Sequence, residues 1–212
     1  MLGSAAARHE GEVVRTGRTF ALQAPQFFFA QDRSLAEEAY AGDIVGIPSK
    51  GLLRIGDAVS EGEDLDFLGV PSFAPEILRR VRLEDAIRAK KLREALRELA
   101  EEGVVQLFFP LDGSPPLLGV IGALQLDVLA DRLGTEYALP IAFDQVPFEA
   151  VRWIAADDKA VVEQFIEKNR SSMSLDLDGD PVFLAATEFN LKWTADKNPQ
   201  VRFLEIKSKA RA

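Results

Sequence analysis

The chain of 212 residues contains no cysteine and a single histidine, His9. The absence of cysteine excludes disulfides, zinc knuckles, iron–sulfur clusters and cysteine nucleophiles. One histidine in an N-terminal stretch of small residues cannot build a multi-histidine metal site, and it gives no basis for a Ser–His–Asp triad. No apolar run approaches about 18 residues, and the N-terminus lacks the features of a signal peptide. We therefore expect a cytoplasmic protein.

Positive charge is also scarce, because the 25 Lys and Arg residues are outnumbered by 34 Asp and Glu residues, which gives a formal net charge of −9. This balance argues against broad nonspecific coating of nucleic acid but leaves room for a local basic patch. Hydrophobic residues make up 47% of the chain and charged residues 28%, which is typical of a globular protein. A chain of this length buries a core without a disulfide or metal.

The motifs of nucleotide-binding proteins are missing. A phosphate-binding loop of the form GxxxxGK[ST] requires a Gly-Lys pair, and the guanine-reading NKxD requires an Asn-Lys pair; the sequence contains neither dipeptide. The pattern DxxG begins at Asp43, Asp66, Asp131 and Asp176, so it is too common in this chain to indicate a site. We expect no cofactor, GTP or GDP included, and no metal in this chain.

Residues 12–70 contain short apolar segments separated by Gly and Pro, a pattern that predicts a small antiparallel β-barrel. Residues 1–11 are expected to form a poorly ordered tail. The expected strands are 12–22, 27–30, 42–47, 52–59 and 64–70, with a turn or a single helical turn over 34–40.

The sequence pattern changes at Pro71–Pro75 from short strand-like segments to alternating strands and helices. We place a domain boundary there, so the second domain spans 71–212. Leu92, Leu96 and Leu99 share one face of a helix that Gly103 is suited to end. The first expected elements are strand 76–83, helix 84–103, strands 104–109 and 117–123, helix 124–134 and strand 137–143, the βαββαβ order of a ferredoxin-like unit. The expected α/β extension comprises strand 148–155, helix 158–169 beginning at Asp157 or Asp158, a hairpin around 176–181, helix 187–196 and strand 201–206. No internal repeat occurs at a fixed period.

Acidic residues offer two kinds of candidate site. Asp176, Asp178 and Asp180 imitate the start of a calcium loop, but Pro181 and Thr187 stand where that loop needs Gly and Glu, so we interpret the segment as a hairpin turn. Paired carboxylates can act as acid and base in hydrolysis, although surface charge is the more common role. The pairs are Glu37–Glu38, Asp64/Asp66, Glu101–Glu102 and Asp157–Asp158; we assign no catalytic residue.

Basic residues cluster once, between residues 79 and 97, in an otherwise acidic chain. Such a local reversal of charge is what a phosphate-contacting patch needs. The alternative is an ordinary solvated helix face with paired strand arginines. The candidate phosphate or RNA contacts are Arg79, Arg80, Arg82, Arg88, Lys90, Lys91 and Arg93.

Several longer segments occur in a characteristic order: FFFAQDRSLAEEAYAGDIVGI, GLLRIGDAVSEGEDLDFLGVPSFAPEILRRVRL, LAEEGVVQLFFP and LLGVIGALQLDVLADRLGTEY. From about residue 13 to about residue 206 the chain closely resembles the C-terminal two-thirds of bacterial peptide chain release factor 3. The resemblance implies an α+β protein with a partial elongation-factor-like antiparallel β-barrel, a ferredoxin-like C-terminal domain and an added α/β extension. Elongation factor G is the nearest competitor, but FAPEILRRVRL and EEGVVQLFFP favour the release factor.

The family consists of translational GTPases that dissociate codon-reading release factors from the ribosome. The resemblance implies that this chain is a ribosome-binding and positioning module. Its partners would be the ribosome and its own GTP-binding domain, with neither membrane nor DNA. GTP, GDP and Mg²⁺ belong to that domain, which the resemblance does not cover, so no catalytic residue carries over. One departure is Ala41, where the family usually has proline.

Three alternatives stay open: an elongation-factor-G-like fragment, a small carboxylate-dependent hydrolase and a stand-alone interaction protein. The resemblance begins after the first strands of the family's barrel, so the remaining strands should expose an unpaired edge. Alternation along a strand cannot place Phe27, Phe28 and Phe29 on one face. We therefore expect self-association through the residues before about 71.

Overall fold

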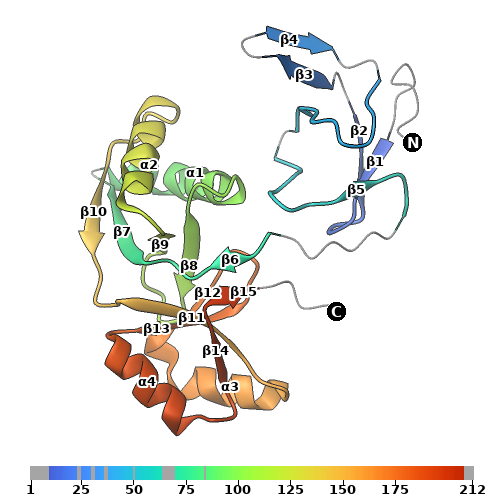
Figure 1. The fold of residues 1–212 in the computed structure, drawn as a ribbon. Helices are drawn as coiled ribbons and strands as arrows, with labels where there is room; N and C mark the ends of the chain where they lie inside the picture. The colour runs from blue at the N-terminus through green and yellow to red at the C-terminus, as the bar shows by residue number, and fades with distance from the viewer. Residues whose placement is uncertain are drawn as a thin grey trace. The chain divides into compact units, whose positions relative to one another are not determined.

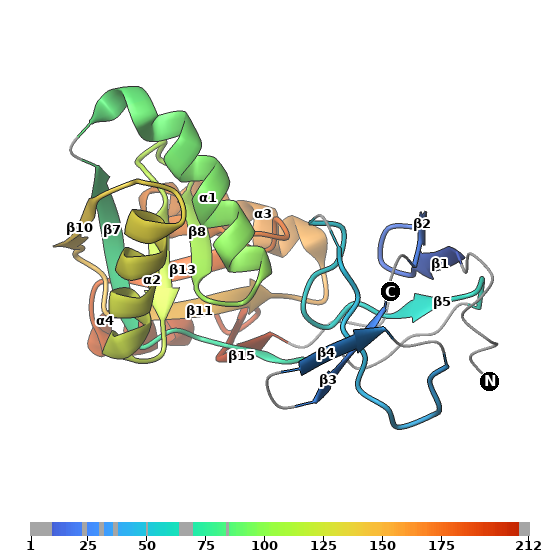
Figure 2. The same ribbon diagram turned by 90° about the horizontal axis from the view of Figure 1, so that it is seen from above.

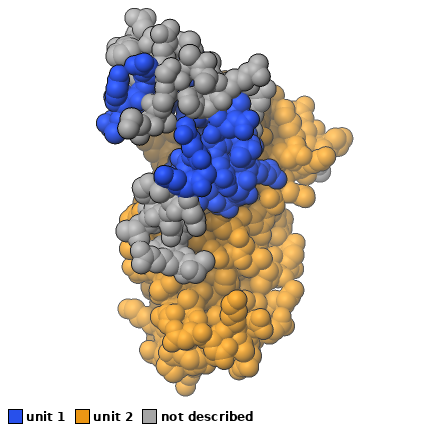
Figure 3. Space-filling model, turned by 90° about the vertical axis from the view of Figure 1, so that its right-hand side faces the viewer, with its two compact units in different colours: residues 1–70 blue, residues 71–212 orange. Residues whose placement is uncertain are grey.

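The computed structural model describes residues 10–22, 25–29, 32–35, 38–49, 51–63, 70–83 and 85–207. The chain divides into two compact units, residues 1–70 and 71–212 (Figure 3). The described part is a mixed α+β structure in which every pair of named strands is antiparallel. None of its helices has the length and apolar character needed to cross a membrane.

The first unit contains two small sheets. In one of them the strands follow the order β2-β1-β5, and in the other β3 pairs with β4. An isolated bridge joins Gln26 to Gly46. The turn after β1 is held to a later turn by Arg15, whose Nε and Nη2 atoms donate to the two carboxylate oxygens of Asp57 at 2.6 and 2.8 Å. The strands are β1 (Glu10–Val13), β2 (Arg18–Ala21), β3 (Gln26–Phe29), β4 (Asp32–Leu35) and β5 (Val59–Ser60).

Several strand expectations in this unit are wrong. The single strand expected over 12–22 is a hairpin, because the chain turns back at Gly17, which has a φ of 63°. Of the strand expected over 42–47, only the bridge at Gly46 is present. Of the strand expected over 52–59, only the last residue, Val59, belongs to a strand, β5. The turn expected from residue 34 begins inside β4. Residues 10 and 11, expected in the poorly ordered tail, belong to β1. The rest of that tail (1–9), most of the strand expected over 64–70 and the side chains of Phe27–Phe29 lie outside what the structure describes.

The described part of the second unit contains an eight-stranded sheet and four α-helices (Figures 1 and 2). A short strand pair, β6 with β15, joins the beginning of this unit to its last described residues. Its first half comprises β6 (Ser72–Phe73), β7 (Ile77–Leu83), the 3₁₀ turn η1 (Ala86–Arg88), α1 (Ala89–Glu101), β8 (Gln106–Pro110), β9 (Leu117–Val120), α2 (Ala123–Thr135) and β10 (Ile141–Gln145). Its second half comprises β11 (Ala150–Ala155), α3 (Lys159–Lys168), the 3₁₀ turn η2 (Arg170–Ser172), β12 (Met173–Leu175), β13 (Pro181–Ala185), α4 (Glu188–Lys197), β14 (Arg202–Leu204) and β15 (Ile206–Lys207).

The two halves of this unit repeat one arrangement. Both run strand, helix, strand, strand, helix, strand, and the sheet order is β10-β7-β9-β8 in the first half and β14-β11-β13-β12 in the second. The inner edge strands β8 and β12 pair, which makes one continuous sheet. The repeat exists at the level of the fold, whereas the sequence has no repeat at a fixed period. The spacing between matched positions changes along the chain, so a search at a fixed period misses it.

Three hydrophobic clusters form the core of the second unit. One lies between α1, α2 and the first half of the sheet, and a second lies between α3, α4 and the second half. In the second cluster the rings of Phe165, Phe183 and Phe203 meet edge to face with centroids 5.5–5.7 Å apart. The third joins residues from the helix-free faces of both halves, including Phe108 and Trp153, so the two halves share one core.

The element boundaries follow from local sequence, with several corrections. Helix α1, expected from residue 84, begins at Ala89 after η1, and the strand expected over 137–143 is β10, which begins at Ile141. Asp158 caps α3 by accepting from the backbone N–H of Ala160 at 2.9 Å, and Gly103 follows α1 with a φ of 74°. Helix α2, expected to end at Gly134, continues to Thr135. The strand expected over 201–206 is interrupted at Glu205 and becomes β14 and β15.

Candidate functional site

The basic segment is divided between strand β7 and helix α1, and its seven candidates do not share one face. Side chains alternate along β7, so Arg80 and Arg82 point to the face opposite Arg79. The Arg82 Nε atom lies 3.1 Å from a carboxylate oxygen of Asp144 on the neighbouring strand, and its side chain is 63% exposed. The Nε atom of Arg80 is buried and has no hydrogen-bond partner among the described residues. The strand arginines are thus partly buried in the sheet or paired with it.

Two cations at the start of α1 hold a loop in place. Arg88 donates from Nη1 to the carbonyl oxygen of Ala138 at 2.8 Å, and the Lys91 ammonium donates to the carbonyl oxygen of Tyr137. These carbonyls lie just beyond α2, where Ala138 adopts a φ of 54°. Arg88 and Lys91 therefore stabilise the path from α2 toward β10.

The remaining cations of α1 point to solvent. Lys90 is 89% exposed, and its Nζ atom lies 3.9 Å from Glu94, a weak surface pair. Arg93, on the next turn, is exposed and has no ion pair among the described residues. Arg97 lies with its guanidinium carbon 5.1 Å from the centroid of the Phe109 ring. Lys90 and Arg93 are thus the candidates that are most available to a phosphate.

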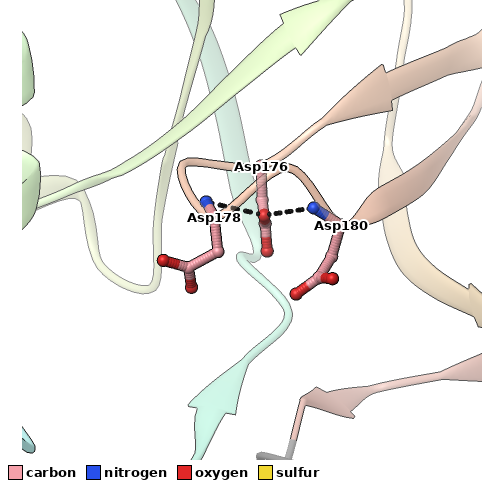
Figure 4. A group of neighbouring side chains, drawn as sticks. All are labelled: Asp176, Asp178 and Asp180. Carbon is pink, nitrogen blue, oxygen red and sulfur yellow. Dashed lines mark hydrogen bonds between the residues drawn. The ribbon is translucent and has the colours of Figure 1, made fainter. Parts of the chain in front are cut away.

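The turn between β12 and β13 gathers three aspartates (Figure 4). The Oδ1 atom of Asp176 accepts from the backbone N–H groups of Asp178 and Asp180, at 3.0 and 2.9 Å. Its Oδ2 atom accepts from the indole N–H of Trp153 at 2.9 Å. The hairpin expected around 176–181 is confirmed, and Gly179 has the positive φ of 90° that this turn requires.

The cation held by these three carboxylates is the ammonium of Lys207. Their oxygen atoms lie within 4.8 Å of one another, and Lys207 Nζ is 2.7 Å from Asp176 and 2.9 Å from Asp178, with a further contact to Asp180. Burial favours the neutral amine, but the three carboxylates outweigh it and raise the pKa of Lys207 above its ordinary value. The cluster is therefore an internal ion-pair network.

Sequence analysis does not single out Lys207. The residue lies 31 positions after Asp176, in a short strand whose partner, β6, opens the unit. No local motif links a lysine to an acidic turn at that distance. Only the pairing of β15 with β6 places it there.

The other paired carboxylates have structural partners where they are described. Glu102 accepts from Arg132 at 2.7 Å and Asp157 from Arg202 at 2.6 Å, while Asp158 caps α3. Glu38 accepts from the Tyr40 hydroxyl at 3.0 Å. Glu37, Asp64 and Asp66 lie outside the described residues. The described pairs are thus engaged with cations, a helix end or a hydroxyl, which is not the arrangement of an acid and base poised for hydrolysis.

Two family models match the chain, one in each unit. The model of elongation factor G domain 2 matches residues 7–62. The model of the class II release factor RF3, C-terminal domain, matches residues 67–195. The predicted relationship to release factor 3 is thereby confirmed. Because the release-factor match alone covers more than half of the 212 residues, the chain belongs to the class II release factor RF3 family.

Proposed function

We propose that this chain binds the ribosome and positions a translation-termination factor there, in the cytoplasm. The observation that carries the proposal is the succession of two translation-factor domains, an elongation factor G domain 2 followed by a release factor RF3 C-terminal domain. In the family, these parts would couple the state of a GTP-binding domain to contacts with the ribosome and so help to release codon-reading release factors. The chain contributes binding and orientation to this process, without chemistry of its own.

The strand orders support the finer architecture that this role implies. The order β10-β7-β9-β8, with α1 and α2 packed on one face, is that of a ferredoxin-like unit. The short antiparallel strands of the first unit suit part of a translation-factor β-barrel. We propose both assignments together with the ribosomal role.

The proposed contact with ribosomal RNA centres on the exposed cations of α1. Lys90 and Arg93 project from a rigid helix whose opposite face, with Leu92, Leu96 and Leu99, is buried in the core. Neutralising phosphates releases counterions, so such a contact weakens as salt rises. Arg79, Arg80, Arg82, Arg88 and Lys91 would support it only secondarily, because the sheet or the loop after α2 engages most of them.

The residues do not fit GTP, GDP or Mg²⁺. The sequence contains neither a phosphate-binding loop nor a guanine reader, and the acidic cluster of the second unit is neutralised by Lys207. We therefore derive no nucleotide-dependent step in this chain. Calorimetric titration with GDP should show no stoichiometric binding at micromolar concentration.

The decisive experiment is co-sedimentation of the full chain with 70S ribosomes over a series of KCl concentrations. The variant K90E/R93E should bind at least about tenfold more weakly and with a shallower salt dependence, because two phosphate contacts are lost. The matched control K192E/K197E makes the same change of net charge on exposed positions of α4 and should bind like the wild type. Equal losses in both variants, with unchanged melting temperatures, would show a general charge effect and contradict the proposed contact.

An elongation-factor role is the second candidate, because the match over residues 7–62 is to elongation factor G. The longer match over residues 67–195 favours the release factor. Competition on the ribosome separates the two, since each role predicts displacement of a different full-length factor.

A further inference from the structure

The two halves of the second unit place one arginine at the same position. Arg79 of β7 lies opposite Leu118 of β9, and Arg152 of β11 lies opposite Phe183 of β13. Each guanidinium donates from Nη1 to the carbonyl oxygen of the residue before it, Leu78 or Val151, at 2.8 Å in both cases. The two arginines are therefore equivalent in strand, register and backbone contact.

Arg152 is neutralised by two carboxylates. Its Nη2 atom lies 2.8 Å from Glu205 and 3.8 Å from Glu188, and only 15% of its side chain is exposed. Glu188 is the first residue of α4. Glu205 follows Leu204, which lies opposite Trp153, so Glu205 is next to Arg152 across the strands. A carboxylate is thus the natural partner at this position of the fold.

The equivalent positions around Arg79 are neutral. The first residue of α2 is Ala123, and the residue directly opposite Arg79 on β10 is Gln145. Opposed residues of antiparallel strands point to the same face, so Gln145 takes the place of Glu205. Within the described part of the chain, Arg79 makes no ion pair. The half-buried guanidinium of Arg79 therefore has N–H donors that form no hydrogen bond to any described carboxylate of the first half.

The start of α2, which corresponds to the part of α4 that lies beside Arg152, carries exposed apolar side chains. Ile121 and Leu124, which is 73% exposed, lie at the start of α2, and Val128 follows one turn later on the same side as Leu124. Asp127 and Asp131 are exposed on the same helix, and their carboxylates would repel a chain of phosphates more strongly than a single carboxylate. The surroundings therefore suit one acidic side chain flanked by apolar residues better than a phosphate backbone.

We propose that Arg79 is the docking point for an aspartate or glutamate side chain of a partner protein, whose carboxylate takes the place that Glu205 occupies beside Arg152. Apolar neighbours of that acidic residue pack on Ile121 and Leu124. The proposal does not depend on the RNA contact centred on Lys90 and Arg93 of α1, in which Arg79 would have only a secondary part. The carboxylate accepts from guanidinium donors that face neutral residues in the free protein, a charge-assisted pairing.

The test is an NMR titration of the arginine Nε–Hε signals of the full chain. The probe is a capped tripeptide of leucine, glutamate and leucine, and its matched control has glutamine in place of glutamate. We expect the glutamate peptide to shift the Arg79 signal and leave the Arg152 signal in place, and the glutamine peptide to shift neither. The variant R79K, which keeps the positive charge, identifies the Arg79 signal by its loss.

The variant Q145E provides the second measurement, because it installs the carboxylate that the first half lacks. Gln145 is exposed, so the substitution should leave the fold intact. It should lower the affinity for the glutamate peptide at least about tenfold, which corresponds to the loss of one charge-assisted hydrogen bond. It should also raise the melting temperature of the chain, but only while Arg79 is present. The proposal is overturned by an unshifted Arg79 signal, by equal shifts of Arg79 and Arg152, by unchanged affinity in Q145E, or by larger shifts with inorganic phosphate or a short RNA.

Discussion

Lys207 provides the positive charge for three aspartates of a single turn. Asp176 is the centre of this turn, because its two oxygens accept from two backbone N–H groups, from Trp153 and from Lys207. The Asp-Gly pair of the sequence, and the residues that exclude a calcium loop, predict the turn correctly. They do not predict the cation, since strand pairing brings that residue from the far end of the unit.

Replacing Lys207 with methionine should lower the free energy of unfolding by about 1–3 kcal/mol at neutral pH, because three close carboxylates lose their partly buried counter-charge. Because the three carboxylates raise the pKa of Lys207, its contribution to stability is complete below the ordinary lysine pKa of 10.5 and is lost as the pH rises above that value, so the deficit should shrink in base. Denaturant unfolding at neutral pH and at pH values above 10.5 measures both effects. Lys192→Met, at an exposed position of α4, serves as the control and should change stability by less than about 0.5 kcal/mol. A deficit independent of pH would contradict the role of the charge.

The chain has two tyrosines in different settings. Burial, followed by a hydrogen bond to Glu98, raises the pKa of Tyr137 to about 12, and a hydrogen bond to Glu38 raises the pKa of the exposed Tyr40. Because the folded state favours neutral Tyr137, its contribution to stability is complete below the ordinary pKa of 10.0 and is lost as the pH rises toward about 12.

Absorbance at 295 nm should accordingly show two tyrosinate steps, and Tyr137→Phe should remove the later one. Glu98→Gln should lower the pKa of Tyr137 only part of the way, because burial remains. A single step that contains both tyrosines would show that Tyr137 is not held as described.

At the scale of the element, the helices are predictable from the sequence and the strands of the first unit are not. The face of Leu92, Leu96 and Leu99 and the glycine after it predict α1 within a few residues, because helix periodicity and end signals are local. The sequence predicts one strand in place of the first hairpin because Gly17 sits in an otherwise strand-like run, and its positive φ turns the chain. Gly134 resembles a helix end in the sequence, but it lies inside α2.

Two glycines of the second unit should respond to alanine in opposite ways. A Cβ at Gly119 in β9 would lie 2.7 Å from both the Phe108 ring and the ring of Pro75, so Gly119→Ala should destabilise by about 1–3 kcal/mol. Gly134 is exposed in α2, and a Cβ there would meet open space, so Gly134→Ala should stabilise by about 0.5–1 kcal/mol. Thermal unfolding of both variants checks the signs, and a neutral Gly119→Ala would contradict the packing of β9.

At the scale of the whole molecule, the family is recognisable from the sequence and the repeat in its second unit is not. Ordered motifs such as FAPEILRRVRL identify the family. The repeat, in contrast, is visible only in the strand order and register, because the segment around Arg79 shares few residue types with the segment around Arg152. The same limit applies to the candidate site, because the basic run is visible in the sequence but its division between β7 and α1 requires the fold. Self-association through the first unit stays a prediction.

The central claim, that the chain is a ribosome-positioning module of a termination factor, is tested most directly by competition. Fluorescently labelled full-length release factor 3 is bound to 70S ribosomes, and the unlabelled chain is titrated in without nucleotide. The chain should displace the labelled factor, and K90E/R93E should do so less well than K192E/K197E. Simultaneous binding of both proteins, or displacement of labelled elongation factor G but not of release factor 3, would contradict it.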